Sequence, residues 1–166
     1  MKKQLLPYIV IGIFAGICVK LFALDILKVK GDSMNDSIKN GDIIFVSKLN
    51  YGLVKPFGDK LMVKWNKPET GEIVTYLYQN NIVVKRCAGT EGDKIKYAVT
   101  DDNKYTMEIN GKTYPLTEHQ YHDIYGNSEV PKGMILAIGD NYNDSFDSRN
   151  YGFIPEENVI GKVLCR

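Results

Sequence analysis

The strongest constraint on the fold is an apolar run near the N-terminus. Residues 5–19 contain no charged side chain, and after Lys20 the run resumes as far as Leu24. A helix of about 20 residues rises to roughly the 30 Å thickness of the apolar core of a bilayer. A lysine near its end can extend its amine to the interface. The sequence therefore predicts one N-terminal transmembrane helix, within an anchor segment of residues 1–25.

Two other interpretations of this run stay open. A cleaved signal peptide shares the basic start and apolar centre, but it needs two small residues before its cleavage site, and residues 22–24 (Phe-Ala-Leu) do not supply both. A buried helix of a soluble protein would normally have a polar face, which residues 5–19 lack. Lys2 and Lys3 favour a cytoplasmic N-terminus at the cell membrane, which would place residues 26–166 outside the cytoplasm.

Residues 26–166 are predicted to form one mostly β domain. Short runs rich in β-branched and aromatic residues are separated by glycine-containing turn pairs. Asn110-Gly111 stands between two such runs and predicts a tight hairpin with a type I′ turn. The predicted strands are residues 43–46, 72–78, 82–84, 106–109, 112–114 and 135–138.

Charge and metal-binding patterns narrow the range of functions. The basic residues gather in the first thirty positions, so the rest of the chain is slightly acidic, which argues against nucleic acid as a partner. The three cysteines have no metal-type spacing. His119 and His122 have no accompanying ligand pattern, and their surroundings are predicted to be a loop. We therefore expect neither a metal nor a cofactor.

Three segments carry side chains suited to peptide-bond chemistry. They are residues 31–34 (Gly-Asp-Ser-Met), 83–86 (Val-Val-Lys-Arg) and 139–149, which end in Ser-Phe-Asp-Ser-Arg. A serine is a poor nucleophile until a base is placed beside it. A lysine can be that base when burial disfavours its charged form, and Lys85 follows an apolar run. The residues alone leave open that Ser33 is an ordinary loop serine and Lys85 an exposed lysine.

In this order after an apolar N-terminus, the three segments resemble those of type I signal peptidases, the Ser-Lys membrane proteases, in their compact Gram-positive form. The resemblance implies a β-barrel or coiled-sheet catalytic domain with a small β accessory insertion at roughly residues 94–132. It also implies an activity, the removal of N-terminal signal peptides from exported preproteins after small residues. The implied partners are these signal peptides, the lipid bilayer and the secretion machinery.

The resemblance further assigns roles to individual residues. Ser33 would be the nucleophile and Lys85 the general base. Ser145 would hydrogen-bond the lysine and orient it, and Asp147 and Arg149 would form a supporting ion pair. The implied substrate-binding positions are all apolar: Leu27, Val29, Met34, Ile38, Ile44 and Val84.

Two further functions were weighed against this one. A non-cleaving relative could use the same groove to hold extended peptides, as an assembly factor or chaperone for surface structures such as pili. The presence of both Ser33 and Lys85 favours an enzyme instead. A self-cleaving Ser-Lys repressor shares the pair, but it would carry a DNA-binding helical domain where this chain has its apolar run. One departure from the pattern is Gly31, where some relatives place a hydroxyl that helps to bind the oxyanion.

Overall fold

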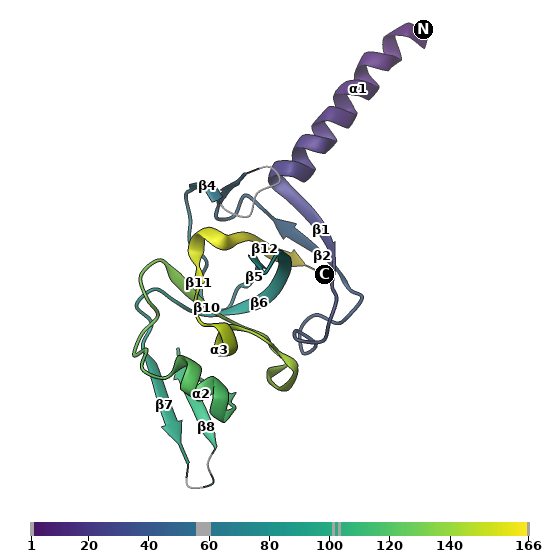
Figure 1. The fold of residues 1–166 in the computed structure, drawn as a ribbon. Coiled ribbons are helices and arrows are strands. Elements are labelled where there is room, and N and C mark those ends of the chain that lie inside the picture. The colour runs from purple at the N-terminus through teal and green to yellow at the C-terminus, as the bar shows by residue number, and fades with distance from the viewer. Residues whose placement is uncertain (1, 56–60, 101, 103, 166) are drawn as a thin grey trace.

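The structure is a computed structural model that describes residues 2–55, 61–100, 102 and 104–165. Figure 1 shows a β domain with a helix projecting from one end and a small lobe at the opposite end. The projecting helix is α1 (Lys2–Cys18), which continues into a short π-helix, η1 (Val19–Ala23). The prediction of a mostly β chain is confirmed.

The main sheet has seven strands, each paired antiparallel with its neighbours. In spatial order they are β1 (Leu24–Lys28), β2 (Ile43–Ser47), β12 (Val159–Cys165), β5 (Ile73–Tyr78), β6 (Asn81–Thr90), β10 (Met134–Ile138) and β11 (Ile154–Pro155). Within the described part of the chain this sheet has two edges, β1 and β11. A closed barrel was therefore the wrong alternative, because the two edge strands do not pair with each other.

Burial along the strands follows from their side-chain period of two. In β2, Ile44 and Val46 are buried while Ile43 and Phe45 are exposed, so one face of this edge of the sheet covers the core. Strand β10 is buried on both faces, because alternate residues enter two different apolar clusters. Its continuous apolar sequence, residues 135–138, reflects this central position.

The other elements surround this sheet. They are β3 (Gly52–Val54), β4 (Leu61–Lys64), β7 (Ile95–Val99), β8 (Tyr105–Ile109), β9 (Lys112–Leu116), α2 (Glu118–Ile124), η2 (Tyr142–Asp144), α3 (Ser148–Tyr151) and η3 (Glu156–Asn158). Strands β7, β8 and β9 form a separate three-stranded sheet, which together with α2 makes up the small lobe (Figure 1). Both Asn110 and Gly111 have positive φ, as the predicted hairpin turn requires.

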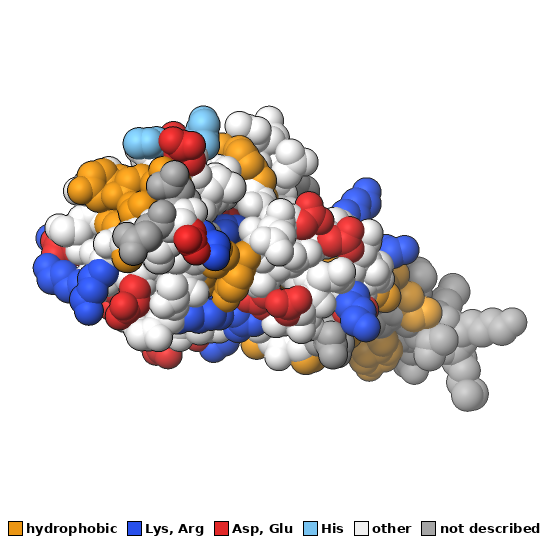
Figure 2. Space-filling model, turned by 90° about the horizontal axis from the view of Figure 1, so that it is seen from below, with side chains coloured by type: hydrophobic (Ala, Val, Ile, Leu, Met, Phe, Trp, Pro, Cys, Tyr) orange, Lys and Arg blue, Asp and Glu red, His pale blue; other side chains and the backbone are white. Residues whose placement is uncertain are grey.

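The prediction of a loop around the two histidines was wrong, because α2 occupies that stretch. Thr117 caps the helix by accepting from the Gln120 backbone N–H, and the Gln120 side chain accepts from the Thr117 backbone N–H. This capping box compensates for the short length of the helix. Both histidines lie at the surface (Figure 2), and His119 pairs with Asp123 at 2.7 Å.

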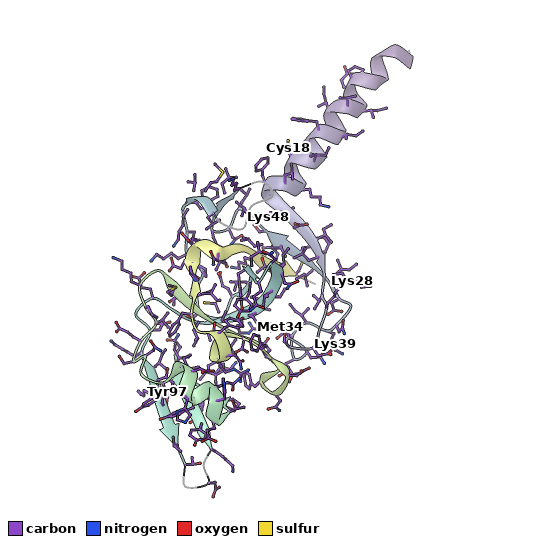
Figure 3. All side chains as sticks on the ribbon, viewed as in Figure 1. Cys18, Lys28, Met34, Lys39, Lys48 and Tyr97 are labelled. Carbon is purple, nitrogen blue, oxygen red and sulfur yellow. The ribbon has the colours of Figure 1, made fainter. Side chains whose placement is uncertain are left out.

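The predicted transmembrane helix also needs correction. Among the described residues, no helix combines the length and the apolarity needed to cross a membrane. The apolar run is divided between elements, because α1 ends at Cys18 and β1 begins at Leu24. Lys48 lies beside this junction (Figure 3), where its amine donates to the Lys20 carbonyl at 3.3 Å and pairs with Asp25 at 2.9 Å.

Candidate active site

Ser33 lies in a tight turn that follows β1. Gly31 has φ +92°, a left-handed conformation that permits the chain to change direction at little steric cost. Beyond it, the Asn35 N–H donates to the Asp32 carbonyl at 3.0 Å, and the Ile38 N–H donates to the Met34 carbonyl at 2.7 Å. The buried side chains of Met34 and Ile38 anchor the turn in an apolar cluster, so the position of Ser33 is fixed by packing on one side.

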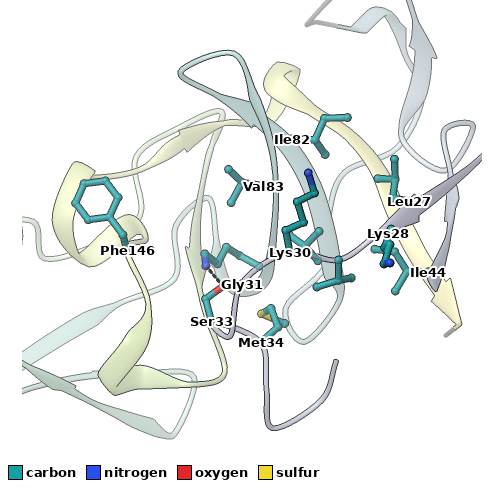
Figure 4. A pocket seen from close by; sticks show the side chains of 13 residues that line it. Leu27, Lys28, Lys30, Gly31, Ser33, Met34, Ile44, Ile82, Val83 and Phe146 are labelled. Atoms are coloured by element: carbon teal, nitrogen blue, oxygen red, sulfur yellow. Dashed lines mark hydrogen bonds between the residues drawn. The ribbon is translucent and has the colours of Figure 1, made fainter. Parts of the chain in front are cut away.

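Lys85 comes from β6, where it lies opposite Val74 of β5. Its side chain is almost fully buried, at 4% exposure, and its Nζ donates a hydrogen bond to Ser33 Oγ at 2.5 Å, drawn as the dashed line in Figure 4. Burial lowers the pKa of the Lys85 amine, although the nearby Asp147 carboxylate acts in the opposite direction. The fold therefore brings a serine hydroxyl against a lysine whose neutral form is favoured.

Ser145 lies beside this pair but does not hydrogen-bond the lysine. Its Oγ donates to Asp147 Oδ2 at 2.6 Å, and no hydrogen bond joins Ser145 to Lys85 in the described structure. In place of the predicted bond, the Ser145 hydroxyl hydrogen-bonds the Asp147 carboxylate. The same Asp147 oxygen accepts from the Gly139 N–H at 2.9 Å, so the carboxylate ties the loop after β10 to the strand itself.

Asp147 and Arg149 form a buried ion pair beneath this loop. Arg149 Nε donates to Asp147 Oδ1 at 2.9 Å, and neither side chain exposes more than 1% of its surface. The guanidinium also donates to the carbonyls of Pro115 and Tyr142, at 3.0 and 2.9 Å. Because Pro115 lies on β9, the ion pair links the three-stranded sheet to the loop that carries Ser145.

Gly139 allows the close approach of the two serine-bearing segments. A Cβ at this position would lie 2.2 Å from Ser145 Oγ and 2.6 Å from the Ser33 carbonyl oxygen. Both distances are far inside van der Waals contact, so any side chain would push these segments apart. Close packing therefore explains why the first residue of the Gly139-Asp140-Asn141 motif is a glycine.

A second ion pair was not assigned any role from the sequence. Arg86 Nε and Nη2 donate to the two oxygens of Asp140 at 2.8 and 2.6 Å, and Ser37 Oγ donates to Asp140 at 2.5 Å. Burial alone would raise the pKa of Asp140, but these hydrogen bonds outweigh it and hold the pKa below its usual value. Arg86, the residue after Lys85, therefore links β6 to Asp140 beyond the end of β10 and to Ser37 in the segment that follows Ser33.

A cleft of about 390 Å³ opens beside Ser33 and Lys85 (Figure 4). Five of the six predicted substrate-binding residues line it, namely Leu27, Val29, Met34, Ile44 and Val84. The sixth, Ile38, does not line the cleft but is buried among Val29, Met34 and Ile44. Sequence analysis did not identify five other lining residues: Lys28, Lys30, Ile82, Val83 and Phe146.

Nothing in the described residues suggests a metal centre at this site. No group of three or more His, Cys, Asp or Glu side chains gathers there or elsewhere in the described part of the chain. The three cysteines, of which Cys87 is buried, are free thiols.

A serine hydroxyl held against a buried amine, at the end of an apolar cleft, is an arrangement suited to the hydrolysis of a bound peptide. Comparison with known proteins agrees with this class. A family model described as "Signal peptidase, peptidase S26" matches residues 2–166. The chain therefore belongs to the signal peptidase family, whose members are hydrolases, and the resemblance seen in the sequence is confirmed.

The chain is also similar to individual relatives and to a solved structure. Signal peptidase IB of Staphylococcus aureus is 30% identical over 190 residues, covering 100% of this chain and 91% of the relative. Signal peptidase I of Buchnera aphidicola subsp. Baizongia pistaciae is 26% identical, covering 88% of this chain and 70% of the relative. A crystal structure of signal peptidase I from Enterococcus faecalis V583 is 29% identical, covering 60% of this chain and 97% of that chain, with a TM-score of 0.40. None of these names supports the alternative of a non-cleaving assembly factor.

Proposed function

We propose that this protein removes signal peptides from exported preproteins with Ser33 as nucleophile and Lys85 as general base. The observation that carries the proposal is the 2.5 Å hydrogen bond between Lys85 Nζ and Ser33 Oγ, with the lysine buried. Burial favours the neutral amine, and only a neutral amine has a lone pair that can accept the serine proton.

The proposed reaction proceeds in two balanced stages. Ser33 Oγ attacks the scissile carbonyl carbon while Lys85 Nζ takes the hydroxyl proton. The C–N bond then breaks, the protonated Lys85 gives its proton to the leaving amine, and the signal peptide remains as an ester on Ser33. Water attacks this ester, again losing a proton to Lys85, and the proton returns to Ser33 Oγ as the ester bond breaks.

The backbone N–H of Ser33 is the proposed donor to the oxyanion. The Asp32–Ser33 peptide is held through its carbonyl, which accepts from Asn141 Nδ2 at 3.1 Å and from the Asn35 N–H at 3.0 Å. Because the N–H of a trans peptide points away from its C=O, these bonds fix the direction of the Ser33 N–H before substrate arrives. Gly31 has no side chain to act as a second donor.

The apolar cleft is the proposed binding site for the residues before the cut. An extended peptide lying along residues 27–31 and 82–84 would direct alternate side chains towards the cleft walls. In this proposal Met34 and Val84 are the walls that favour small side chains there. Ser145, Asp147 and Arg149 would support the pair from beneath, through the loop after β10 rather than by a bond to the lysine.

The experiment is cleavage of a model preprotein by the purified protein in detergent. With Ala before the cut we expect cleavage at that bond, and with Phe there we expect kcat/KM to fall at least about tenfold, because the larger ring overlaps the cleft walls. Equal cleavage of the two substrates would contradict the assignment of the cleft residues. Failure to cleave either would contradict the proposed function.

Association with a lipid bilayer is a second part of the proposal. Apolar side chains lie exposed on α1 and on three neighbouring strands of the main sheet, including Phe14 of α1, Ile26 of β1, Phe45 of β2 and Leu164 of β12. Ile26 and Phe45 are direct cross-strand partners, so they form one patch at the sheet edge that follows α1. Exposed apolar surface of this extent is typical of an interaction site. The cytoplasmic N-terminus, extracytoplasmic catalytic domain and contact with secretion machinery remain predictions within this proposal.

Vesicle binding tests this part. In co-sedimentation with phosphatidylglycerol–phosphatidylcholine vesicles, the double variant Ile26→Lys/Phe45→Lys should bind several-fold more weakly than the wild type, because two charges replace apolar surface. The matched control is Val99→Lys, an exposed apolar residue of β7 in the small lobe. Equal loss of binding in the control, or none in the double variant, would contradict a lipid-facing role for the patch.

A further inference from the structure

A second pocket adjoins the apolar cleft at Ser33. Its volume is about 490 Å³, and its lining residues are Gly31, Asp32, Ser33, Asn143, Asp144, Ser145 and Phe146. Gly31, Ser33 and Phe146 line both pockets. Ser33 therefore lies where the two pockets meet, so a peptide that crosses the nucleophile can pass from the first pocket into the second.

Phe146 is exposed in this cleft although its backbone is held on both sides. Its neighbours Ser145 and Asp147 belong to the buried hydrogen-bond network, yet 62% of Phe146 itself is exposed. The ring packs edge-on against Tyr151, with centroids 5.3 Å apart, and Tyr151 in turn stacks on Tyr78 at 4.0 Å. The ring is thus held by its neighbours, remains largely exposed, and lines both pockets.

Although Phe146 also lines the first pocket, its ring lies away from part of that pocket's apolar wall. Figure 4 shows Phe146 on the opposite side of the cleft from Leu27 and Ile44. Small residues before the cut would lie against those apolar walls. The ring would therefore be available to a side chain beyond the scissile bond.

The charges lining the two pockets have opposite signs. Apart from Lys85, the charged side chains of the first pocket are Lys28 and Lys30, whereas those of the second are Asp32 and Asp144. Within the described residues, neither of these carboxylates has an ion pair or a side-chain hydrogen bond. A cation that enters the second pocket would therefore meet negative charge together with an aromatic ring.

We propose that Phe146 is a specificity-determining residue, which contacts the substrate residue directly after the scissile bond and favours Lys or Arg there. The inference rests on the proposed function, because that function sets which pocket holds the leaving side. The aliphatic stem of such a side chain can lie against the ring, and its charged group interacts favourably with the ring face. Asp32 and Asp144 attract the same charge and disfavour an acidic residue.

The test measures kcat/KM for three preproteins that differ only in the residue after the cut, which is Lys, Leu or Glu. For the wild type at low salt we expect the Lys substrate to be preferred over Glu by about tenfold. In Phe146→Ala this preference should fall by a few-fold, with Phe146→Leu between the two and Phe146→Tyr close to the wild type. Asp144→Asn should also reduce the preference, and added salt should reduce it further.

Tyr125→Ala is the matched control, because Tyr125 is another exposed aromatic residue but lies in the small lobe, outside both pockets. It should keep the full preference, and thermal unfolding should show that every variant is folded. A wild type that cleaves all three substrates equally would overturn the inference and leave the proposed function standing. An unchanged preference in folded Phe146→Ala would likewise overturn it, while no cleavage of any substrate would overturn both.

Discussion

Replacing Ser33 by alanine should lower kcat for preprotein cleavage by about 10³-fold or more, without lowering the thermal unfolding temperature. The variant lacks the oxygen that attacks the scissile carbonyl, and loss of a nucleophile in a serine protease costs several orders of magnitude. The turn should persist, because Met34 and Ile38 remain buried and the Asn141 N–H still donates to the Ser33 carbonyl, at 3.0 Å.

The matched control for this substitution is Ser128→Ala. Ser128 is exposed and lines neither pocket, so its hydroxyl should not affect cleavage. Cleavage by folded Ser33→Ala at more than a tenth of the wild-type rate would show that another group attacks the substrate.

Lys85→Met should also abolish cleavage, and it should raise rather than lower the stability of the fold at neutral pH. Burial lowers the pKa of Lys85 in the folded state below the ordinary lysine value of 10.5. Between the lowered folded-state pKa and pH 10.5, the unfolded chain is protonated at this lysine while the folded chain is mostly not. The free energy of unfolding therefore decreases as the pH falls through this range, and it stops decreasing below the folded-state pKa. Methionine carries no such group, so the variant should lose this pH dependence.

Thermal unfolding at several pH values, paired with cleavage assays, measures both effects. The matched control is Lys96→Met, since the Lys96 side chain is 76% exposed and should alter neither stability nor cleavage appreciably. An inactive Lys85→Met protein that is also clearly less stable than the wild type at neutral pH would mean that the amine stabilises the fold, contrary to this account.

The order of short motifs was enough to predict the centre of the site. Ser33 and Lys85 are far apart in the sequence, and the resemblance carried by these motifs paired them. The apolar run before Lys85 indicated a strand, and β6 brings the amine to the serine, although Ile82 of that run is itself exposed. The β-branched and aromatic residues of β2 and β10 likewise predicted these strands, but the alternating burial of β2 is not visible in its uniformly apolar sequence.

The remaining features depend on contacts that a linear pattern does not contain. The apolar run does not show that helix ends at Cys18 and a strand begins at Leu24, because apolar residues suit both. The acceptor of the Ser145 hydroxyl is decided by where Asp147 lies, which depends on its bond from the Gly139 N–H. Phe146 could have been buried or exposed, and only the packing of Tyr151 places its ring in the cleft.

The most direct test of the Ser33–Lys85 mechanism is the rate of preprotein cleavage as a function of pH, for the wild type and Lys85→Arg. For the wild type we expect kcat/KM to rise about tenfold per pH unit below the folded-state pKa of Lys85, and to level off above it. Because that pKa is lowered by burial, the plateau should begin below pH 10.5. Arginine stays protonated throughout, so Lys85→Arg should be inactive at every pH. An active Lys85→Arg enzyme, or a wild-type rate that falls with rising pH while the protein stays folded, would contradict a neutral lysine as the base.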